Sequence, residues 1–498
     1  MLTYTKIFCV ALLCSLILTP LVRRWALRWN IVDHPDEHRK LHRGVIPLAG
    51  GLAVFGGIVA ALVITYFWSP GWQGRFSANG NSLSVLLTAS AAICLLGLLD
   101  DRWGLRGRQK LVGQILVALI LVSSGLLIRK ITIFEFPIEL GLLAIPFTLF
   151  WLVGATNALN LIDGMDGLAT SVGIVLSLAI SVMAMMTGHQ VDALVAMAIA
   201  GSLTGFWVYN SAPASIFLGD AGSMLIGLVL GTLAIRCSLK GPATIALVAP
   251  TALLAVPIMD VLMAIVRRVL MGRSIYSADR GHLHHRLLNR GYNQQMTVII
   301  ISLLCAITAA GALYAQFVRN DLLAIVAVAA MVAMLVITRL FGYEEFQLIK
   351  LRAKHFFRSL VPKHRRQPEH GQLETHLQGN AQWRELWNTL AEFAERHDLK
   401  IIQLDVHLPA HGEEYSAGWK RSNVTDDDQQ WNCELPLIAH GVPIGRLRIT
   451  GTSNHHQSAC ISISELIYDL KPFETQMLDL LEQELPQIRQ RTLHTQPP

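Results

Sequence analysis

The sequence predicts an all-α, polytopic membrane protein of about eleven transmembrane helices with a C-terminal cytoplasmic α+β domain. Hydrophobic residues make up 52% of the 498-residue chain and charged residues only 15%. This balance is too apolar for one soluble fold of such length. The apolar residues gather in blocks long enough to cross a bilayer, and beyond residue 340 these blocks give way to segments rich in charge.

Residues 1–340 form the predicted transmembrane core. The short apolar blocks near residues 191 and 222 are the weakest predictions of a span. All the blocks lie near residues 4–22, 48–68, 83–99, 111–128, 139–156, 168–187, 191–208, 222–236, 243–266, 296–317 and 321–338.

Lys and Arg gather in alternate loops of this core. Basic clusters occupy residues 23–43, 102–110 and 267–290, whereas the opposite loops carry only scattered cations. By the positive-inside rule the basic loops are cytoplasmic, so the N-terminus is expected outside and the C-terminus inside. The formal net charge of +6 then faces anionic headgroups and phosphorylated substrates rather than nucleic acid.

Cysteine spacing excludes two kinds of site. The seven cysteines show no CxxC pairing, and most of them fall inside the apolar blocks. This pattern indicates neither a disulfide framework nor a zinc site.

Carboxylates recur where the apolar blocks meet the basic loops. Charged groups at a bilayer edge are unfavourable, so a repeated set of them indicates a functional site. Carboxylates from several helices beside His, Lys or Arg suit a hard divalent cation and a phosphate, which predicts phosphoryl transfer. The clusters are Asp100-Asp101, the run NALNLIDGMDG from Asn157 to Gly167, Asp220 in FLGDAGS, and Asp279 before the histidines of DRGHLHH.

Taken singly, the aspartates at block ends also fit a plainer structural role. Adjacent aspartates commonly cap a helix, and Asp220 fits the N-cap of the following block. The basic run after Asp100-Asp101 favours function, because Arg108 and Lys110 can neutralise a lipid phosphate.

Polar residues recur every third position in NALNLIDGMDG. Its two internal glycines argue for an irregular, re-entrant turn, which is tolerated at membrane depth only where it lines a polar cavity. The histidines of HLHH could bind zinc, but no further Cys or His supports that ligand set. Contact with a phosphate or pyrophosphate is the better interpretation, and an interfacial basic loop is the plainer one.

In this order, the motifs resemble the polyprenyl-phosphate N-acetylhexosamine-1-phosphate transferase family of integral membrane enzymes. The resemblance covers roughly residues 1–340 and is closest to the branch that uses UDP-N-acetylglucosamine and undecaprenyl phosphate. It runs through HPDEHRKLHRGVIPLAGG (His34–Gly51), LLDDRWGLRGRQK, NALNLIDGMDGLA, FLGDAGS, PIMD (Pro257–Asp260) and DRGHLHHRLL.

The resemblance implies roles for individual residues. Asp163 and Asp220 are implied as ligands of Mg²⁺, with Mn²⁺ as the alternative metal. The implied catalytic residues are Asp100, Asp101, Asp163 and Asp220. The implied substrate-binding residues are Lys40, Lys110, Asn157, Asn160, Asp166, His282, His284 and His285.

The implied reaction moves N-acetylglucosamine 1-phosphate from UDP-N-acetylglucosamine to undecaprenyl phosphate and releases UMP. Its product starts a cell-envelope polysaccharide such as lipopolysaccharide O-antigen, at the bacterial inner membrane, with the active site facing the cytoplasm. A homodimer through the spans is also implied. A different UDP-N-acetyl-hexosamine donor remains an alternative, because it would keep the same motifs.

Beyond the core, residues 341–379 are predicted to form an amphipathic basic helix and a polar linker. Residues 380–498 are predicted to form a cytoplasmic α+β domain, with a helix at WRELWNTLAEFAERH, four strands between about 400 and 450, and a closing helix from Ile463 to Arg489. This domain is expected to bind a regulator or a partner enzyme, to mediate oligomerisation, or to be inert.

Two functions from other classes also fit part of this pattern. A transporter with an acidic cytoplasmic vestibule also places carboxylates in spans, but it predicts them near the bilayer midplane in interrupted helices. A membrane-anchored scaffold leaves the motifs of the core unexplained. The clustering of carboxylates at one face favours the enzyme.

Overall fold

The computed structural model divides the chain into two compact units, residues 1–265 with 282–340, and residues 266–281 with 341–498. The structure describes residues 2–33, 45–133, 136–241, 244–246, 248–270, 281–341, 371–378, 383–397, 399–408, 413–421, 430–439, 442–452, 466 and 470–484.

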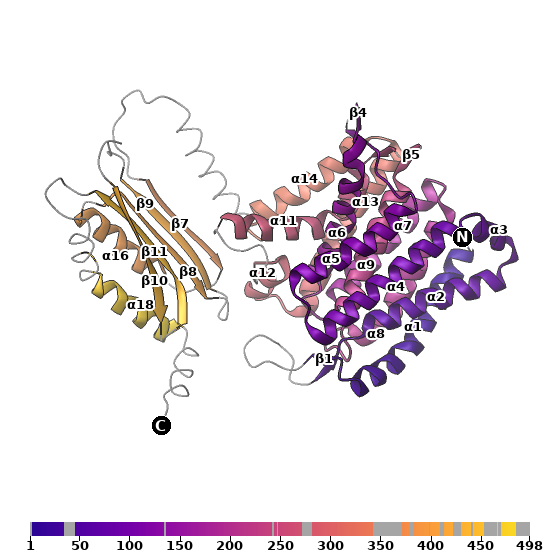
Figure 1. Ribbon diagram of the computed structural model, residues 1–498, viewed down its shortest axis with the longest axis horizontal. Coiled ribbons are helices and arrows are strands. Elements are labelled where there is room, and N and C mark those ends of the chain that lie inside the picture. Colours follow the sequence, from indigo (N-terminus) through magenta and orange to yellow (C-terminus); the bar gives the residue numbers. More distant parts are fainter. Residues whose placement is uncertain are drawn as a thin grey trace. The chain divides into compact units, whose positions relative to one another are not determined.

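The first unit is a helical bundle that confirms the polytopic membrane fold (Figure 1). Within the described residues, eight helices are long and apolar enough to cross a membrane. They are α1 (Leu2–Arg28), α2 (Gly50–Trp68), α4 (Gly80–Trp103), α6 (Ala144–Ile162), α7 (Leu168–Met186), α8 (Gln190–Asn210), α9 (Gly219–Cys237) and α13 (Gln294–Val318).

The remaining apolar blocks are helical but shorter. Both α5 (Gly107–Ser123) and α14 (Asp321–Ile337) have 17 residues. The block at 243–266 divides between α10 (Val248–Leu253) and α11 (Ala255–Leu270). The blocks near residues 191 and 222, the weakest predictions of a span, become α8 and α9, both of spanning length.

Helix α9 is the centre of the bundle. Its residues are apolar on every side and almost all buried, as expected for a helix with neighbours all round. It packs against α4, α6, α2 and α7, while α1 packs against α8 and α2, and α13 against α7 and α14. The core of this unit therefore surrounds the helix that begins with Gly219 and Asp220.

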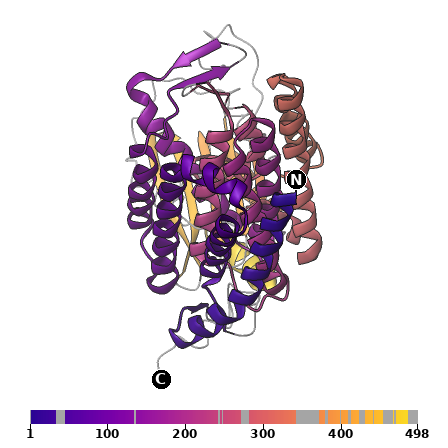
Figure 2. The same cartoon turned by 90° about the vertical axis from the view of Figure 1, so that its right-hand side faces the viewer.

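Short strands and helices occupy the ends of the bundle (Figures 1 and 2). At one end β1 (Val32–Asp33) pairs with β2 (Ile46–Pro47). A four-stranded sheet of order β4-β3-β6-β5, which the sequence did not predict, forms from β3 (Lys130–Ile133), β4 (Phe136–Glu139), β5 (Leu239–Gly241) and β6 (Thr244–Ala246). The short helices are α3 (Pro70–Ala78), η1 (Gly141–Leu143) and α12 (Leu283–Asn289).

The second unit contains a five-stranded antiparallel sheet of order β10-β11-β8-β9-β7. Its strands are β7 (Gly371–Gln378), β8 (Ile401–Leu408), β9 (Glu413–Lys420), β10 (Gln430–Ala439) and β11 (Val442–Thr452), and its helices are α16 (Trp383–Arg396) and α18 (Lys471–Glu484). These elements confirm the predicted α+β domain.

One face of this sheet packs against the helices. Ile402, Leu404 and Val406 alternate along β8 and join a buried core that includes Trp387 of α16 and Phe473 at the start of α18. Strand β7 lies in a segment predicted as linker. Helix α18 lies within the predicted closing helix, whose expected ends at Ile463 and Arg489 fall outside the described residues. The predicted amphipathic helix also lies outside the described residues.

Candidate active site

The N-terminus of α9 is held by close backbone contacts that only glycine permits. Gly219 has φ +73°, and a Cβ there would lie 2.6 Å from both a carboxylate oxygen of Asp101 and the carbonyl oxygen of Leu48. A Cβ on Gly97 of α4 would lie 2.3 Å from the backbone nitrogen of Ala221. These glycines let α2, α4 and α9 meet at one point.

Asp101 caps α9 from the neighbouring helix. Its Oδ1 accepts the backbone N–H of Asp220 at 2.9 Å, and its Oδ2 accepts that of Ala221 at 3.1 Å. The first N–H groups of a helix have no partner inside the helix and attract negative charge, so this carboxylate satisfies two of them. Asp101 therefore holds the first turn of α9, and with it Asp220, in place.

Lys110 joins the paired aspartates to Asp220. Its Nζ lies 2.9 Å from Oδ2 of Asp100 and 2.7 Å from Oδ2 of Asp220, and it donates to Oδ1 of Asn160 at 3.1 Å. Asn160 in turn donates to Oδ1 of Asp220 at 2.5 Å and to the hydroxyl of Ser223 at 2.9 Å. Four elements of the bundle thus converge on one charge-paired cluster.

Asn157 lies one helical turn before Asn160 and takes no part in that cluster. Its Nδ2 donates to Oε1 of Gln114 at 2.7 Å, and Nε2 of Gln114 returns a contact to Oδ1 of Asn157 at 3.3 Å. These reciprocal contacts satisfy both amides inside the bundle. The structure therefore places Asn157 beneath the cluster, as a link between α5 and α6.

The loop between α6 and α7 carries Asp163 and Asp166 with the irregular backbone that its glycines predict. Gly167 adopts φ +72°, and Oδ2 of Asp166 accepts the backbone N–H of Ala214 at 3.0 Å. Burial, together with the nearby carboxylates of Asp220 and Asp166, raises the pKa of Asp163 to about 8. Asp163 thus lies in a concentration of negative charge that favours a cation.

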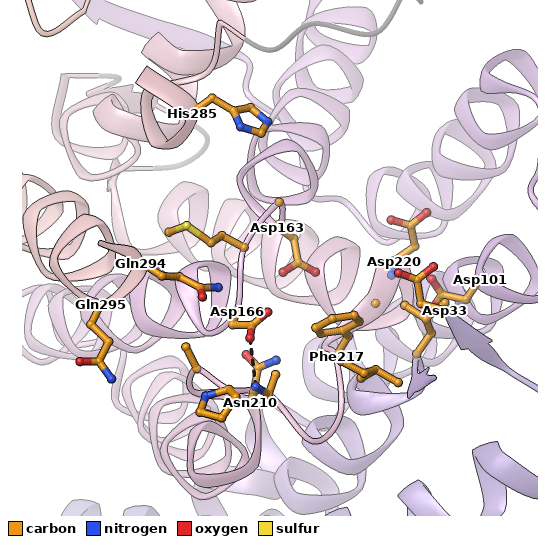
Figure 3. Close-up of a pocket in the computed structure, with 18 of the residues that line it drawn as sticks. Asp33, Asp101, Asp163, Asp166, Asn210, Phe217, Asp220, His285, Gln294 and Gln295 are labelled. Carbon is orange, nitrogen blue, oxygen red and sulfur yellow. Dashed lines mark hydrogen bonds between the residues drawn. The ribbon is translucent and has the colours of Figure 1, made fainter. Parts of the chain in front are cut away.

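A pocket of about 1020 Å³ opens over these groups (Figure 3). Small-molecule sites commonly measure about 300–1,000 Å³, so a nucleotide sugar fits this volume. Of the predicted site residues, Asp101, Asp163, Asp166, Asp220 and His285 line the pocket.

The histidine segment divides between pocket and interior. Only His285 is among the lining residues, whereas His282 and His284 are buried. The rings of His284 and His285 lie 4.3 Å apart between centroids. Lys40 and Asp279 lie outside the described residues, and the roles predicted for all these side chains stay predictions.

Several lining residues were not singled out from the sequence. Asp33 belongs to the β1–β2 hairpin, Asn210 ends α8, and Phe217 precedes the start of α9. Gln294 and Gln295 begin α13, and Figure 3 shows Gln294 on the side of the pocket away from Asp101 and Asp220. Their presence depends on how distant segments meet, although Phe217 is the first residue of the motif FLGDAGS, three residues before Asp220.

The carboxylates fit a magnesium ion that is completed by substrate. Among the residues that the structure describes, no three His, Cys, Asp or Glu side chains form a complete metal-binding group. Mg²⁺ is commonly held by one or two carboxylates together with substrate phosphates and water. Asp163 and Asp220, both facing the pocket, supply oxygen ligands of the right kind.

Comparison with known proteins agrees with this arrangement. The family model for glycosyl transferase family 4 matches residues 83–238, which hold Asp101, Asp163, Asp166 and Asp220. A protein of Bacillus subtilis (strain 168) is 36% identical over 302 residues, 60% of this chain and 80% of the relative. The chain belongs to glycosyl transferase family 4. It is a multi-pass membrane protein of that family, as the resemblance predicted.

The relatives carry names that describe one type of reaction. The Bacillus subtilis relative is named a probable undecaprenyl-phosphate N-acetylglucosaminyl 1-phosphate transferase. A Mycobacterium tuberculosis (strain CDC 1551 / Oshkosh) relative, 37% identical over 58% of this chain and 77% of its own length, is named a decaprenyl-phosphate N-acetylglucosaminephosphotransferase. A Yersinia pestis undecaprenyl-phosphate alpha-N-acetylglucosaminyl 1-phosphate transferase is 29% identical over 58% of this chain and 77% of its own. These names support the predicted branch.

Proposed function

We propose that this protein transfers N-acetylglucosamine 1-phosphate from UDP-N-acetylglucosamine to undecaprenyl phosphate, releasing UMP. The product is the lipid-linked first intermediate of a cell-envelope polysaccharide. The observation that carries the proposal is the acidic pocket at the start of α9, where Asp101, Asp163 and Asp220 meet. The names of the relatives support the donor and the acceptor.

The proposed reaction is a single displacement at phosphorus. An oxygen of the lipid phosphate attacks the β-phosphorus of the donor, and the bond from that phosphorus to the bridging oxygen breaks as UMP leaves. Such transfers depend mainly on positioning and electrostatic stabilisation. The hydrogen bonds of Asp100 and Asp101 support this route over an aspartyl-phosphate. Asp101 uses both oxygens to accept backbone N–H groups, and Asp100 accepts the N–H of Leu105 and pairs with Lys110.

Lys110 is the proposed electrostatic partner of the transferred group. It contacts Asp100 and Asp220 at the edge of the pocket. Its ammonium group can stabilise the negative charge that develops on a phosphate bound there. Asp163 and Asp220 would hold Mg²⁺, which supplies charge compensation on the diphosphate when bound. His285 and Asp166, which both line the pocket, are the proposed contacts of the sugar diphosphate and the nucleotide.

The pocket is proposed to face the cytoplasm. Basic residues of the predicted cytoplasmic loops lie at this end of the bundle. The Nε of Arg23 donates to the carbonyl of Ser215, just before the pocket residue Phe217, and Arg102 donates to the carbonyl of Asn30, near Asp33. The positive-inside rule then supports access from the side where nucleotide sugars are made available.

The test is an assay of purified protein with radiolabelled UDP-N-acetylglucosamine and undecaprenyl phosphate, with Mg²⁺ or with EDTA. The expected result is metal-dependent formation of lipid-linked sugar together with UMP in equal amounts. Activity only with another UDP-N-acetyl-hexosamine would replace the donor. The absence of product with every donor would contradict the proposal.

A further inference from the structure

The three histidines that follow the predicted motif DRG occupy different surroundings. His285 lines the pocket. His282 and His284 are 5% and 3% exposed, and their rings lie nearly parallel with centroids 5.9 Å apart. Two of the three histidines are therefore held inside the protein, and what holds them determines where the third one lies.

Asp260 of α11 holds the start of the histidine helix. This aspartate is 2% exposed. Its Oδ2 lies 2.8 Å from Nδ1 of His282, and its Oδ1 accepts the backbone N–H of Leu283 at 2.8 Å. Because an ionised carboxylate only accepts hydrogen bonds, His282 donates its Nδ1–H. Both oxygens are thus engaged by the first residues of α12.

His284 connects α12 to the loop that contains Asp163. A Cβ on Gly164 would lie 2.7 Å from Nε2 of His284, so the imidazole packs directly against the glycine. Nε2 of His284 is buried without a hydrogen-bond partner, and burial lowers the pKa of His284 to about 3. The ring is therefore neutral and acts in this contact through its shape.

We propose that Asp260 is a positioning residue that sets α12 against the loop of Asp163 and thereby places His285 in the pocket. Its carboxylate contacts His282 and Leu283, neither of which is among the lining residues of the pocket, and it acts through them. The proposal rests on the proposed function, since it concerns the turnover of that same pocket. In metal sites, replacing a carboxylate that orients a ligating histidine commonly lowers metal affinity or activity about 10- to 100-fold, and we expect an effect of that size here.

The decisive test is a double-mutant cycle of Asp260→Asn and His285→Ala in the full-length protein. Asn keeps the size of the side chain but presents an amide to His282 or Leu283, where the carboxylate accepted from both. We expect Asp260→Asn to lower kcat about 10- to 100-fold with a much smaller change in the KM for the donor. We also expect the double variant to match His285→Ala within about twofold, because both changes remove the same placement.

A structural role alone predicts a different result. If Asp260 only stabilises the fold, its effect and that of His285→Ala multiply, and this outcome overturns the proposal. Asp192→Asn is the matched control, because Asp192 is 3% exposed and paired with Arg236 at the start of α8. It lies 18 residues before Asn210 in the same helix, a rise of about 27 Å, and its effect is expected to multiply with that of His285→Ala.

A second variant perturbs the same contact from the other side. Gly164→Ala places a methyl group against His284 and is expected to lower kcat non-additively with Asp260→Asn. Gly154→Ala is the control, because a Cβ there meets nothing within 4 Å. Equal activities of the two alanine variants would overturn the proposed contact.

Hydrogen exchange separates this inference from the reaction itself. Asp260→Asn is expected to raise amide exchange in Leu283–Asn289 while leaving the middle of α13 unchanged. If the wild type forms no lipid-linked product but this local change is seen, the proposed function fails and the placement by Asp260 stands. Unchanged exchange in α12 overturns the placement, whatever the activity.

Discussion

Two places in this protein show one cation bridging two carboxylates, and their surroundings differ. In the bundle, Lys110 joins Asp100 and Asp220, with side chains 17%, 9% and 30% exposed. In the C-terminal sheet, Arg446 joins Asp405 and Glu434, with side chains 32%, 21% and 50% exposed and longer contacts of 3.3 and 3.5 Å.

The difference lies in burial and in what the groups face. Lys110, Asp100 and Asp220 come from three helices, with Asp220 lying 110 residues after Lys110 in the sequence, and Asp220 lines the pocket. Arg446, Asp405 and Glu434 lie on adjacent strands, on the sheet face opposite the buried core. Exposed ion pairs contribute little to stability, whereas buried ones are strongly coupled to their surroundings. The same arrangement of charges therefore predicts function in the first case and a solvated surface in the second.

The strongest expected contrast is at Asp101. Replacing it by Ala removes both acceptors from the first turn of α9, so Asp220 is no longer held in place. We expect turnover to fall at least about 1000-fold while the protein still inserts into the membrane and elutes as a folded species. Asp321→Ala, in the first turn of α14, is the control, and an equal loss there would contradict the assignment.

Replacing Lys110 or Arg446 by Met tests directly whether the two cation-bridged carboxylate pairs differ in their contribution to stability and activity. Lys110→Met leaves Asp100 and the 30% exposed Asp220 without their cation. Breaking a fully buried pair costs about 3–5 kcal/mol, and because Asp220 is partly solvated we expect the free energy of unfolding to fall by about 1–3 kcal/mol. We expect that loss together with about a 100-fold drop in kcat. Arg446→Met should change the free energy of unfolding by less than about 1 kcal/mol and leave transfer unchanged. Thermal unfolding and the transfer assay, run on both variants, decide whether burial makes the difference.

The buried histidine gives a dependence on pH. Burial lowers the pKa of His284 to about 3, while an unfolded histidine titrates at about 6.5. Between these values the unfolded chain binds a proton that the folded protein does not, so the free energy of unfolding falls as the pH falls.

From pH 7 to pH 5 this single group contributes a loss of about 2 kcal/mol. The loss should disappear in His284→Leu. Parallel unfolding curves for the two proteins across this range would show that His284 is not buried in its neutral form.

The smallest expected effect concerns the C-terminal domain. Deletion from residue 370 onward removes the sheet and its core but no pocket residue. Transfer by the truncated protein is expected to stay within about twofold of the full chain. Complete loss of transfer activity, with the bundle still folded, would show that catalysis requires the C-terminal domain and would contradict this prediction.

The sequence predicted what local patterns determine. Apolar blocks indicated the spans because each block is long enough to cross a bilayer without help from distant residues. Alternation indicated β8 through β11 for the same reason. The strand β7 was missed because its polar sequence, GQLETHLQ, lacks clear alternation, and the β3–β6 sheet was missed because its strands have only three or four residues.

The residues of the site could be predicted from the sequence, but the contacts between them could not. Polar side chains at span ends identified Asp101, Asp163 and Asp220. That Lys110 contacts a carboxylate 110 residues away, or that Asp260 holds His282, depends on tertiary packing. Gln294 was overlooked because an amide at the start of a helix has no sequence signal that distinguishes pocket lining from a solvated end.

The proposed transfer depends above all on the carboxylate cluster at the start of α9. The most direct measurement compares Asp220→Asn with Asp405→Asn, each a cation-bridged aspartate made neutral, in formation of lipid-linked sugar from UDP-N-acetylglucosamine and undecaprenyl phosphate. The prediction is no detectable product for Asp220→Asn and wild-type product for Asp405→Asn, with both proteins folded. Wild-type turnover by Asp220→Asn would contradict the claim.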